Sequence, residues 1–147
     1  MKKRIIGATL LTVVCALLIS NVVGVFLFRS REMSAARENL QELLILMDSQ
    51  SEITDPQGVA AQFTQAAPGK RLTIIDTDGT VLADTEANPE ELEDHSSRPE
   101  VEQAALTGWG EASRHSETLG TTMLYVAKRF ADGMVGRASM PLSSIDS

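Results

Sequence analysis

The sequence of 147 residues contains only one cysteine and two histidines. The cysteine, Cys15, lies inside the longest apolar run, so the rest of the chain has no thiol for a disulfide bond or a cysteine-based metal site. Valine precedes Cys15, where a lipoprotein cleavage site needs a small residue. A soluble part without cysteine is compatible with an oxidising exterior.

The shortage of histidine also limits catalysis. A Ser/His/Asp arrangement needs a histidine that is held by a carboxylate, and neither His95 nor His115 lies in a recognisable motif. The sequence also lacks the G-x-S-x-G turn that presents a nucleophilic serine. We therefore expect no catalytic residue, no metal ligand and no cofactor, and an enzyme is the least favoured class.

Acidic residues crowd positions 84–94, and their carboxylates are the ligands that calcium or magnesium prefers. Their spacing does not match an EF-hand, so a solvated acidic loop is favoured, and a weak cation site stays open. Residues 30–147 carry 9 basic and 20 acidic side chains, a formal charge of 9 − 20 = −11. Such a domain should repel nucleic acid and anionic lipid.

An uncharged apolar run from Ile5 to Phe28 is long enough, as a helix, to cross a bilayer. A cleaved signal peptide is the alternative, but the run is long and lacks an A-x-A-like end. We expect residues 1–4, with their compact basic triplet, to be cytoplasmic and residues 5–28 to span a membrane. The remainder would then be extracytoplasmic.

Residues 29–50 are predicted to continue the helix beyond the membrane. Apolar residues there follow the spacing of a helix seam, which favours a homodimer, and the seam consists of Met33, Ala36, Leu40, Leu43 and Met47. Packing of the same stripe on the chain's own domain has about equal weight. Ser20 and Gly24 add a small-xxx-small pair to the span, which gives the dimer weak support.

Residues 51–142 show the pattern of one mixed domain. Asp55 and the proline after it predict a helix start, and Gly79 predicts a tight turn between two strands. Pro99 and Gly108 bound another helix, with Val101, Ala104 and Ala105 on one face. The predicted strands are 71–76, 81–84, 111–115, 123–130 and 135–140, and the polar segment 85–98 is predicted to be a surface excursion.

The predicted fold class is α+β. An N-terminal transmembrane helix continues into a long helix, and a PAS-like or Cache-like antiparallel sheet of about five strands with flanking helices follows. Basic side chains stand out in this acidic domain, and each could bind a carboxylate or phosphate or, as the favoured use, pair with the acidic loop. These side chains are Arg98, Arg114, Lys128, Arg129 and Arg137.

The segment 71–84, RLTIIDTDGTVLAD, resembles the sensor hairpin of phosphate-regulon-type (PhoR-like) membrane histidine kinases. Segments 94–101, 114–119 and 123–127 are similar to the following parts of that sensor region. The resemblance implies an extracytoplasmic PAS-like domain between two membrane helices. It departs at Gly136, where the family prefers a bulky apolar residue, which puts the packing of the last strand in doubt.

We take His95, Arg98, Arg114 and Tyr125 as candidate ligand-binding residues. The resemblance implies the input module of a two-component sensor histidine kinase, with residues 143–147 opening the link to a second membrane helix and with the kinase core beyond this sequence. The alternative is a free-standing, membrane-anchored interaction module. The partner is an unknown small ligand or envelope protein, and phosphate is disfavoured because the domain is strongly acidic.

Overall fold

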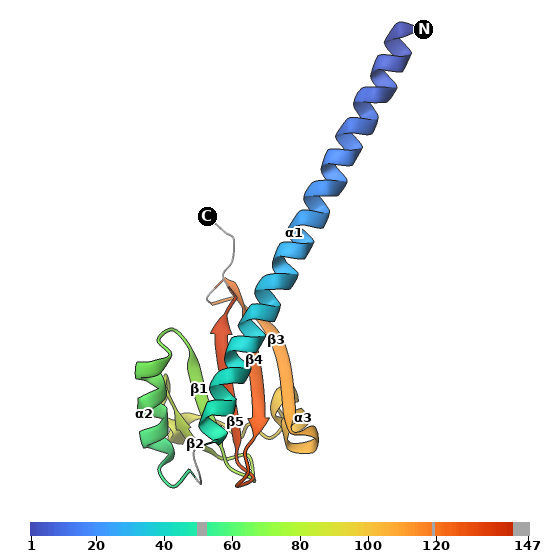
Figure 1. Cartoon of the computed structure of the whole chain (residues 1–147). Coiled ribbons are helices and arrows are strands. Elements are labelled where there is room, and N and C mark those ends of the chain that lie inside the picture. The colour runs from blue at the N-terminus through green and yellow to red at the C-terminus, as the bar shows by residue number, and fades with distance from the viewer. Residues whose placement is uncertain (50–52, 119, 143–147) are drawn as a thin grey trace. The chain divides into compact units, whose positions relative to one another are not determined.

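The computed structural model describes residues 1–49, 53–118 and 120–142 (Figure 1). The chain divides into two compact units, Met1–Ser34 and Ala35–Ser147. Helix α1, Lys2–Asp48, contributes residues to both units. The expected link at 143–147, and residues 50–52 at the expected start of the sensor domain, lie outside the described residues.

The first unit is the N-terminal part of α1. Its apolar side chains are exposed, and the helix is long and apolar enough to cross a membrane. The few polar side chains of this stretch bond within the helix. Thr9 and Thr12 donate to carbonyl oxygens four residues earlier, at 2.8 and 2.9 Å, and Asn21 does so at 3.1 Å. These bonds reduce the cost of placing polar groups in an apolar medium.

The second unit contains the remaining elements. They are α2 (Pro56–Ala66), β1 (Arg71–Ile75), β2 (Val81–Asp84), the short 3₁₀ helix η1 (Pro89–Glu91), α3 (Pro99–Thr107), β3 (Trp109–Ser116), β4 (Thr121–Arg129) and β5 (Val135–Pro141). The predicted boundary signals are observed. Asp55 accepts the N-cap bond from Gly58 N at 3.0 Å, and Gly79 and Gly108 have φ angles of +92° and +95°.

The five strands form one antiparallel sheet in the order β2-β1-β5-β4-β3, which confirms the predicted α+β class. Strand β1 pairs with β2 on one side and with β5, the last strand, on the other. The segment 85–108 therefore carries the chain from one edge strand to the opposite edge strand. This crossover brings α3 and the acidic segment over the face of the sheet.

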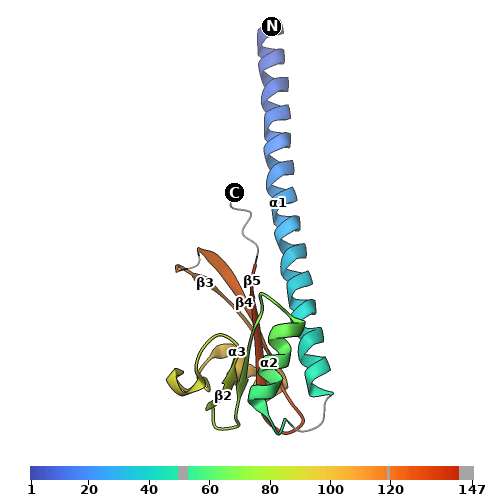
Figure 2. The ribbon, with the colours of Figure 1, turned by 90° about the vertical axis from the view of Figure 1, so that its left-hand side faces the viewer.

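Helices cover both faces of the sheet (Figure 2). Helices α1 and α2 lie on one side, where Leu40 and Leu44 of α1 are fully buried, and α3 lies on the other. The core on the α3 side consists of Ile75, Val101, Ala104, Ala127 and Val135.

The structure bears on two points that the sequence left open on the α1 side. Ala36 and Leu40 of the predicted seam are 7% and 0% exposed, because they pack on the chain's own domain, which was the alternative of about equal weight. The missing bulky residue at Gly136 does not weaken β5, since a Cβ there would collide with the ring of Phe130 and lie 3.2 Å from Cδ2 of Leu44. Neighbouring side chains already fill that space.

Candidate functional site

A patch of polar side chains occupies the sheet face opposite α1. Cross-strand neighbours Arg71 and Ser139 lie beside cross-strand neighbours Thr73 and Arg137, so β1 and β5 each contribute one arginine and one hydroxyl. The two arginines are diagonal to each other on the patch. Thr73, Arg137 and Ser139 are only 1%, 5% and 2% exposed. Tyr125 of β4 is the cross-strand neighbour of Ser139 and extends the patch.

Glu100, at the start of α3, holds two guanidinium groups at one end of this patch. Arg114 donates from Nη2 to Oε1 at 2.6 Å and from Nη1 to Oε2 at 3.1 Å, whereas Arg137 reaches Oε1 at 3.2 Å. The Glu100 side chain is 0% exposed. Both arginines stack on Tyr125, with guanidinium carbons 4.3 and 5.1 Å from the ring centroid. Arg137 is therefore the more buried and the less closely paired of the two cations.

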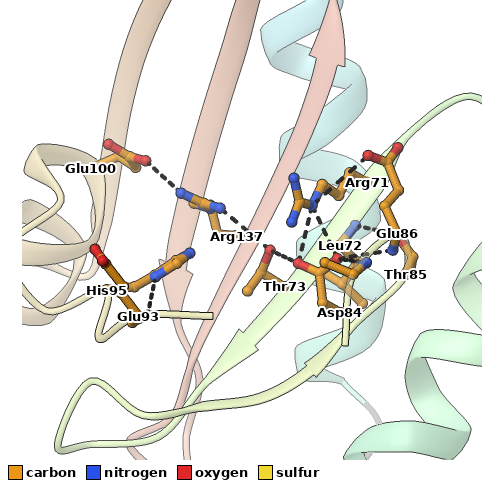
Figure 3. A network of polar contacts seen from close by, with 11 residues as sticks. Arg71, Leu72, Thr73, Asp84, Thr85, Glu86, Glu93, His95, Glu100 and Arg137 are labelled. Carbon is orange, nitrogen blue, oxygen red and sulfur yellow. Dashed lines mark hydrogen bonds and ion pairs between the residues drawn. The ribbon is translucent and has the colours of Figure 1, made fainter. Parts of the chain in front are cut away.

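Asp84 holds the other end of the patch (Figure 3). Its carboxylate is buried and accepts from Arg71 Nε at 3.0 Å and from the Thr73 hydroxyl at 2.8 Å. Backbone N–H groups of Glu86 and Ala87 also donate to Asp84, which fixes the chain as it leaves β2. Arg137 Nη2 lies 3.5 Å from the Thr73 hydroxyl, so Thr73 links the two ends.

The charges of this network are tuned by burial and pairing. Burial alone would raise the pKa of Glu100, but the hydrogen bond and charge of Arg114 and the charge of Arg137 hold it below its usual range. The pKa of Asp84 is likewise lowered, since its hydrogen-bond donors outweigh its burial. Burial lowers the pKa of Arg137, and the neighbouring charge of Arg71 acts in the same direction. The two buried carboxylates are thus stable anions.

His95 lies beside Arg137 over the same face and is only 4% exposed. Its ring Nδ1 lies 2.7 Å from the carbonyl oxygen of Glu93, and its backbone N–H donates to Gly79 O at 3.0 Å. Burial is the main reason that the pKa of His95 is lowered, and the charges of Arg137, Arg98 and Arg71 add to it. The buried, neutral His95 therefore attaches the segment 85–98 to this face of the sheet.

This environment predicts that the domain loses stability in mild acid. Because the pKa of His95 is lower in the folded chain than its unfolded value near 6.5, the unfolded state binds the proton more readily. The stability contribution is complete above about pH 6.5 and is lost as pH falls from there toward the folded pKa. Thermal unfolding of the whole chain at pH 7.5 and pH 5.5 measures it. His95→Gln should flatten the dependence, and an unchanged slope in that variant would contradict the assignment.

The structure brings together three of the four predicted ligand-binding residues. Arg114 and Tyr125 stack on each other, and His95 lies over the same sheet face. Arg98 lies at the N-cap of α3 and is exposed, so it stands apart from the buried patch.

Other members of the patch were missed, namely Arg71, Thr73, Asp84, Glu100 and Ser139. A signal for three of them, Arg71, Thr73 and Ser139, exists in the strand patterns. Arg71 and Thr73 alternate with the buried Leu72 and Ile74, and Arg137 and Ser139 alternate with Gly136 and Ala138. Since neighbouring residues of a strand point to opposite faces, this pattern places polar side chains together on one face.

Among the described residues, the acidic positions 84–94 pair with Arg71, through Asp84 and Glu86, and not with the basic side chains that were expected to pair with them. Arg114 and Arg137 pair with Glu100 of α3, and Lys128 Nζ lies 2.7 Å from Asp48 Oδ2 of α1. Arg37 of α1 pairs with Glu111 of β3, its Nη2 lying 2.7 Å from Oε1. Within the described residues, no group of three or more His, Cys, Asp or Glu side chains could hold a metal ion.

No protein-family model and no curated protein matches this chain. Among solved structures, it is similar to the extracellular domain of rpHK1S-Z16, assigned as a histidine kinase, with a TM-score of 0.41 and 16% identity over 56% of this chain and 37% of that one. It is also similar to the Bacillus subtilis YkuI protein, with an EAL domain, in complex with c-di-GMP and calcium. There the TM-score is 0.47, with 15% identity over 77% of this chain and 31% of that one. The chain thus spans about a third of either structure, and these scores are too low to support a function.

Proposed function

We propose that this chain is the extracytoplasmic sensing input module of a membrane-bound two-component sensor histidine kinase. One observation carries the proposal. A single helix, α1, contains an apolar segment of membrane-spanning length and ends in residues that pack on a sheet whose other face holds a buried polar patch. A stimulus at the patch therefore has a continuous route of packed elements to the helix.

The contacts of β3 and β4 suggest how a signal would pass. On the patch side, these strands carry Arg114 and Tyr125, and on the α1 side they carry Glu111 and Lys128. The latter two side chains pair with Arg37 and Asp48 of α1, and Asp48 also accepts from the backbone N–H of Ala131 at 2.9 Å. A shift of β3 and β4 would thus move α1 between two packing arrangements on the sheet. This requires that a ligand binds the domain with different affinity in the two arrangements.

The kinase assignment rests on the likeness of segment 71–84 to the sensor hairpin of PhoR-like kinases, with the glycine turn that this hairpin needs. In that arrangement the parent protein autophosphorylates a histidine, and this chain supplies only the input. Its N-terminus lies on the cytoplasmic side of the bacterial plasma membrane, and its sensor domain lies on the outer side. The basic residues at positions 2–4 support this orientation.

The proposal includes a homodimer, with a different contact from the predicted seam. Since Ala36 and Leu40 are buried within the chain, the large exposed apolar side chains of α1 after the apolar run are Ile45 and Leu46, which are 50% and 62% exposed. An apolar-lined groove of about 430 Å³ between α1 and α2 continues this surface. A second copy anchored in the same membrane would be held at high effective concentration.

We expect Leu46→Cys to cross-link between copies in membranes, with Glu42→Cys as an exposed control; equal cross-linking of both would contradict this contact.

Two measurements test the proposal. The coding sequence after Ser147 should encode a second apolar span and a histidine-kinase core; a stop codon with neither would favour the free-standing interaction module. Alkaline phosphatase fused after Ser147 is active only outside the cytoplasm, so an active fusion is expected. An inactive fusion would overturn the orientation.

A further inference from the structure

The polar patch has a surplus of hydrogen-bond donors between its two diagonal arginines. In the described part of the chain, Arg71 bonds Asp84 through Nε alone, and its terminal nitrogens have no such partner. On the other side, Arg137 reaches only the distant Thr73 hydroxyl with Nη2, at 3.5 Å. Figure 3 shows the two guanidinium groups on either side of Thr73. Two like charges thus share a buried region with unused donors on both.

The surroundings of the two arginines also suit an anion. Two nearly fully buried hydroxyl side chains, Thr73 and Ser139, lie beside them in the sheet. The Thr73 hydroxyl already donates to Asp84 at 2.8 Å, so Ser139 is the one of the two that can donate to an anion. Neutral His95 lies over Arg137 and adds no charge. The neighbouring carboxylates are already paired: Asp84 accepts from Arg71 and Thr73, and Glu100 accepts from Arg114 and Arg137. Glu86 also lies 3.9 Å from Arg71 Nε. An anion placed between the arginines would therefore bind the terminal nitrogens that these carboxylates leave unbonded.

We propose that a small carboxylate anion binds between Arg71 and Arg137, beside the hydroxyl of Ser139. A guanidinium group presents paired donors to a planar carboxylate, and a charge-assisted bond is stronger than a neutral one. The Arg71 side chain is 26% exposed, which gives the anion a path from solvent. A monoanion is also repelled less than phosphate by a domain with a formal charge of −11 (9 − 20).

The inference rests on the proposed sensing role for its biological meaning, but binding is measured on this chain alone. Its failure would leave the fusion and coding-sequence tests of the proposed function untouched. The probe is sodium acetate, added to the purified full chain in nonionic detergent. Sodium chloride at equal ionic strength corrects for screening.

Acetate should raise the midpoint of thermal unfolding by about 5 °C at ten times its dissociation constant. The shift should disappear in Arg71→Gln and shrink in Ser139→Ala, which removes only a hydroxyl. Arg98→Gln, an exposed arginine outside the patch, is the matched control and should keep the full shift. Arg137 is left unchanged, because its substitution could unfold the domain.

Equal midpoints in acetate and chloride would overturn the site. A full acetate shift in both patch variants would overturn its location. A larger shift with inorganic phosphate than with acetate at equal ionic strength would overturn the assignment to a carboxylate.

Discussion

Replacing Glu100 with alanine is expected to lower the free energy of unfolding by about 3–5 kcal/mol. The carboxylate is fully buried and neutralises Arg114 and Arg137 together. Its loss leaves Arg137, which is only 5% exposed, without an anionic partner. A buried unpaired charge is among the costliest defects in a folded protein, because the lost pairing no longer offsets the desolvation of the remaining cation.

Urea denaturation of the whole chain in detergent measures this loss, with the fluorescence of the sole tryptophan, Trp109, as the signal. Glu102→Ala is the matched control, since Glu102 lies in the same first turn of α3 but is exposed. We expect the control to change stability by less than about 0.5 kcal/mol. Equal effects of the two substitutions would show that Glu100 acts only through the helix terminus.

The positions of the helices, strands and turns along the chain were predictable because the sequence signals for them are local. The cap at Asp55 and the left-handed glycines at 79 and 108 depend on residues adjacent in sequence, and the structure places each where the sequence predicted it. The five strands were likewise predicted from segments bounded by turn residues. Strand order has no such local signal, since β1 pairs with both β2 and β5, and the second pairing joins residues from Ile75↔Val135 to Arg71↔Ser139, which are sixty or more positions apart.

The site was less predictable because its key contacts are long-range and its key residues look like surface residues. Glu100 lies in the first turn of α3, where an exposed carboxylate is favourable beside the positive end of a helix, so its sequence position gives no sign of burial. The predicted apolar face was Val101, Ala104 and Ala105, but the buried face is Glu100, Val101 and Ala104, and Ala105 is exposed. The helix is thus rotated so that a carboxylate faces the core, which is favourable only because arginines of β3 and β5 meet it there.

The acidic segment shows the same limit. Segment 85–98 was predicted to be a surface excursion, and its residues are exposed or half-buried except for His95. The sequence did not predict that His95 is buried or that Asp84, the residue before the segment, has a fully buried side chain. Nothing in the composition of such a segment distinguishes a solvated carboxylate from one that arginine neutralises. The distinction depends on Arg71, which is far enough away in sequence that only the β1–β2 pairing brings it near.

The position of Glu100 depends in turn on a close approach between α3 and β3. Gly110 of β3 faces the first turn of α3, and a Cβ at this position would collide with the carbonyl oxygen of Glu100 and lie 3.0 Å from the backbone N of Ala104. Both obstacles are backbone atoms, so no rotation of a side chain can relieve them. Glycine therefore lets the helix lie close enough for the carboxylate to reach Arg114 and Arg137.

Gly110→Ala is expected to destabilise the chain by about 2–3 kcal/mol, since overpacked sites typically cost about 1–3 kcal/mol and this one displaces a helix. The usual gain of about 0.4–1 kcal/mol from a less flexible unfolded state opposes this loss and is too small to cancel it. The same urea titration measures the effect, with Ser113→Ala, an exposed position of β3, as the control. Because the displaced helix carries Glu100, combining Gly110→Ala with Glu100→Ala should cost less than the sum of the two. Additive losses would show that the glycine and the carboxylate act independently.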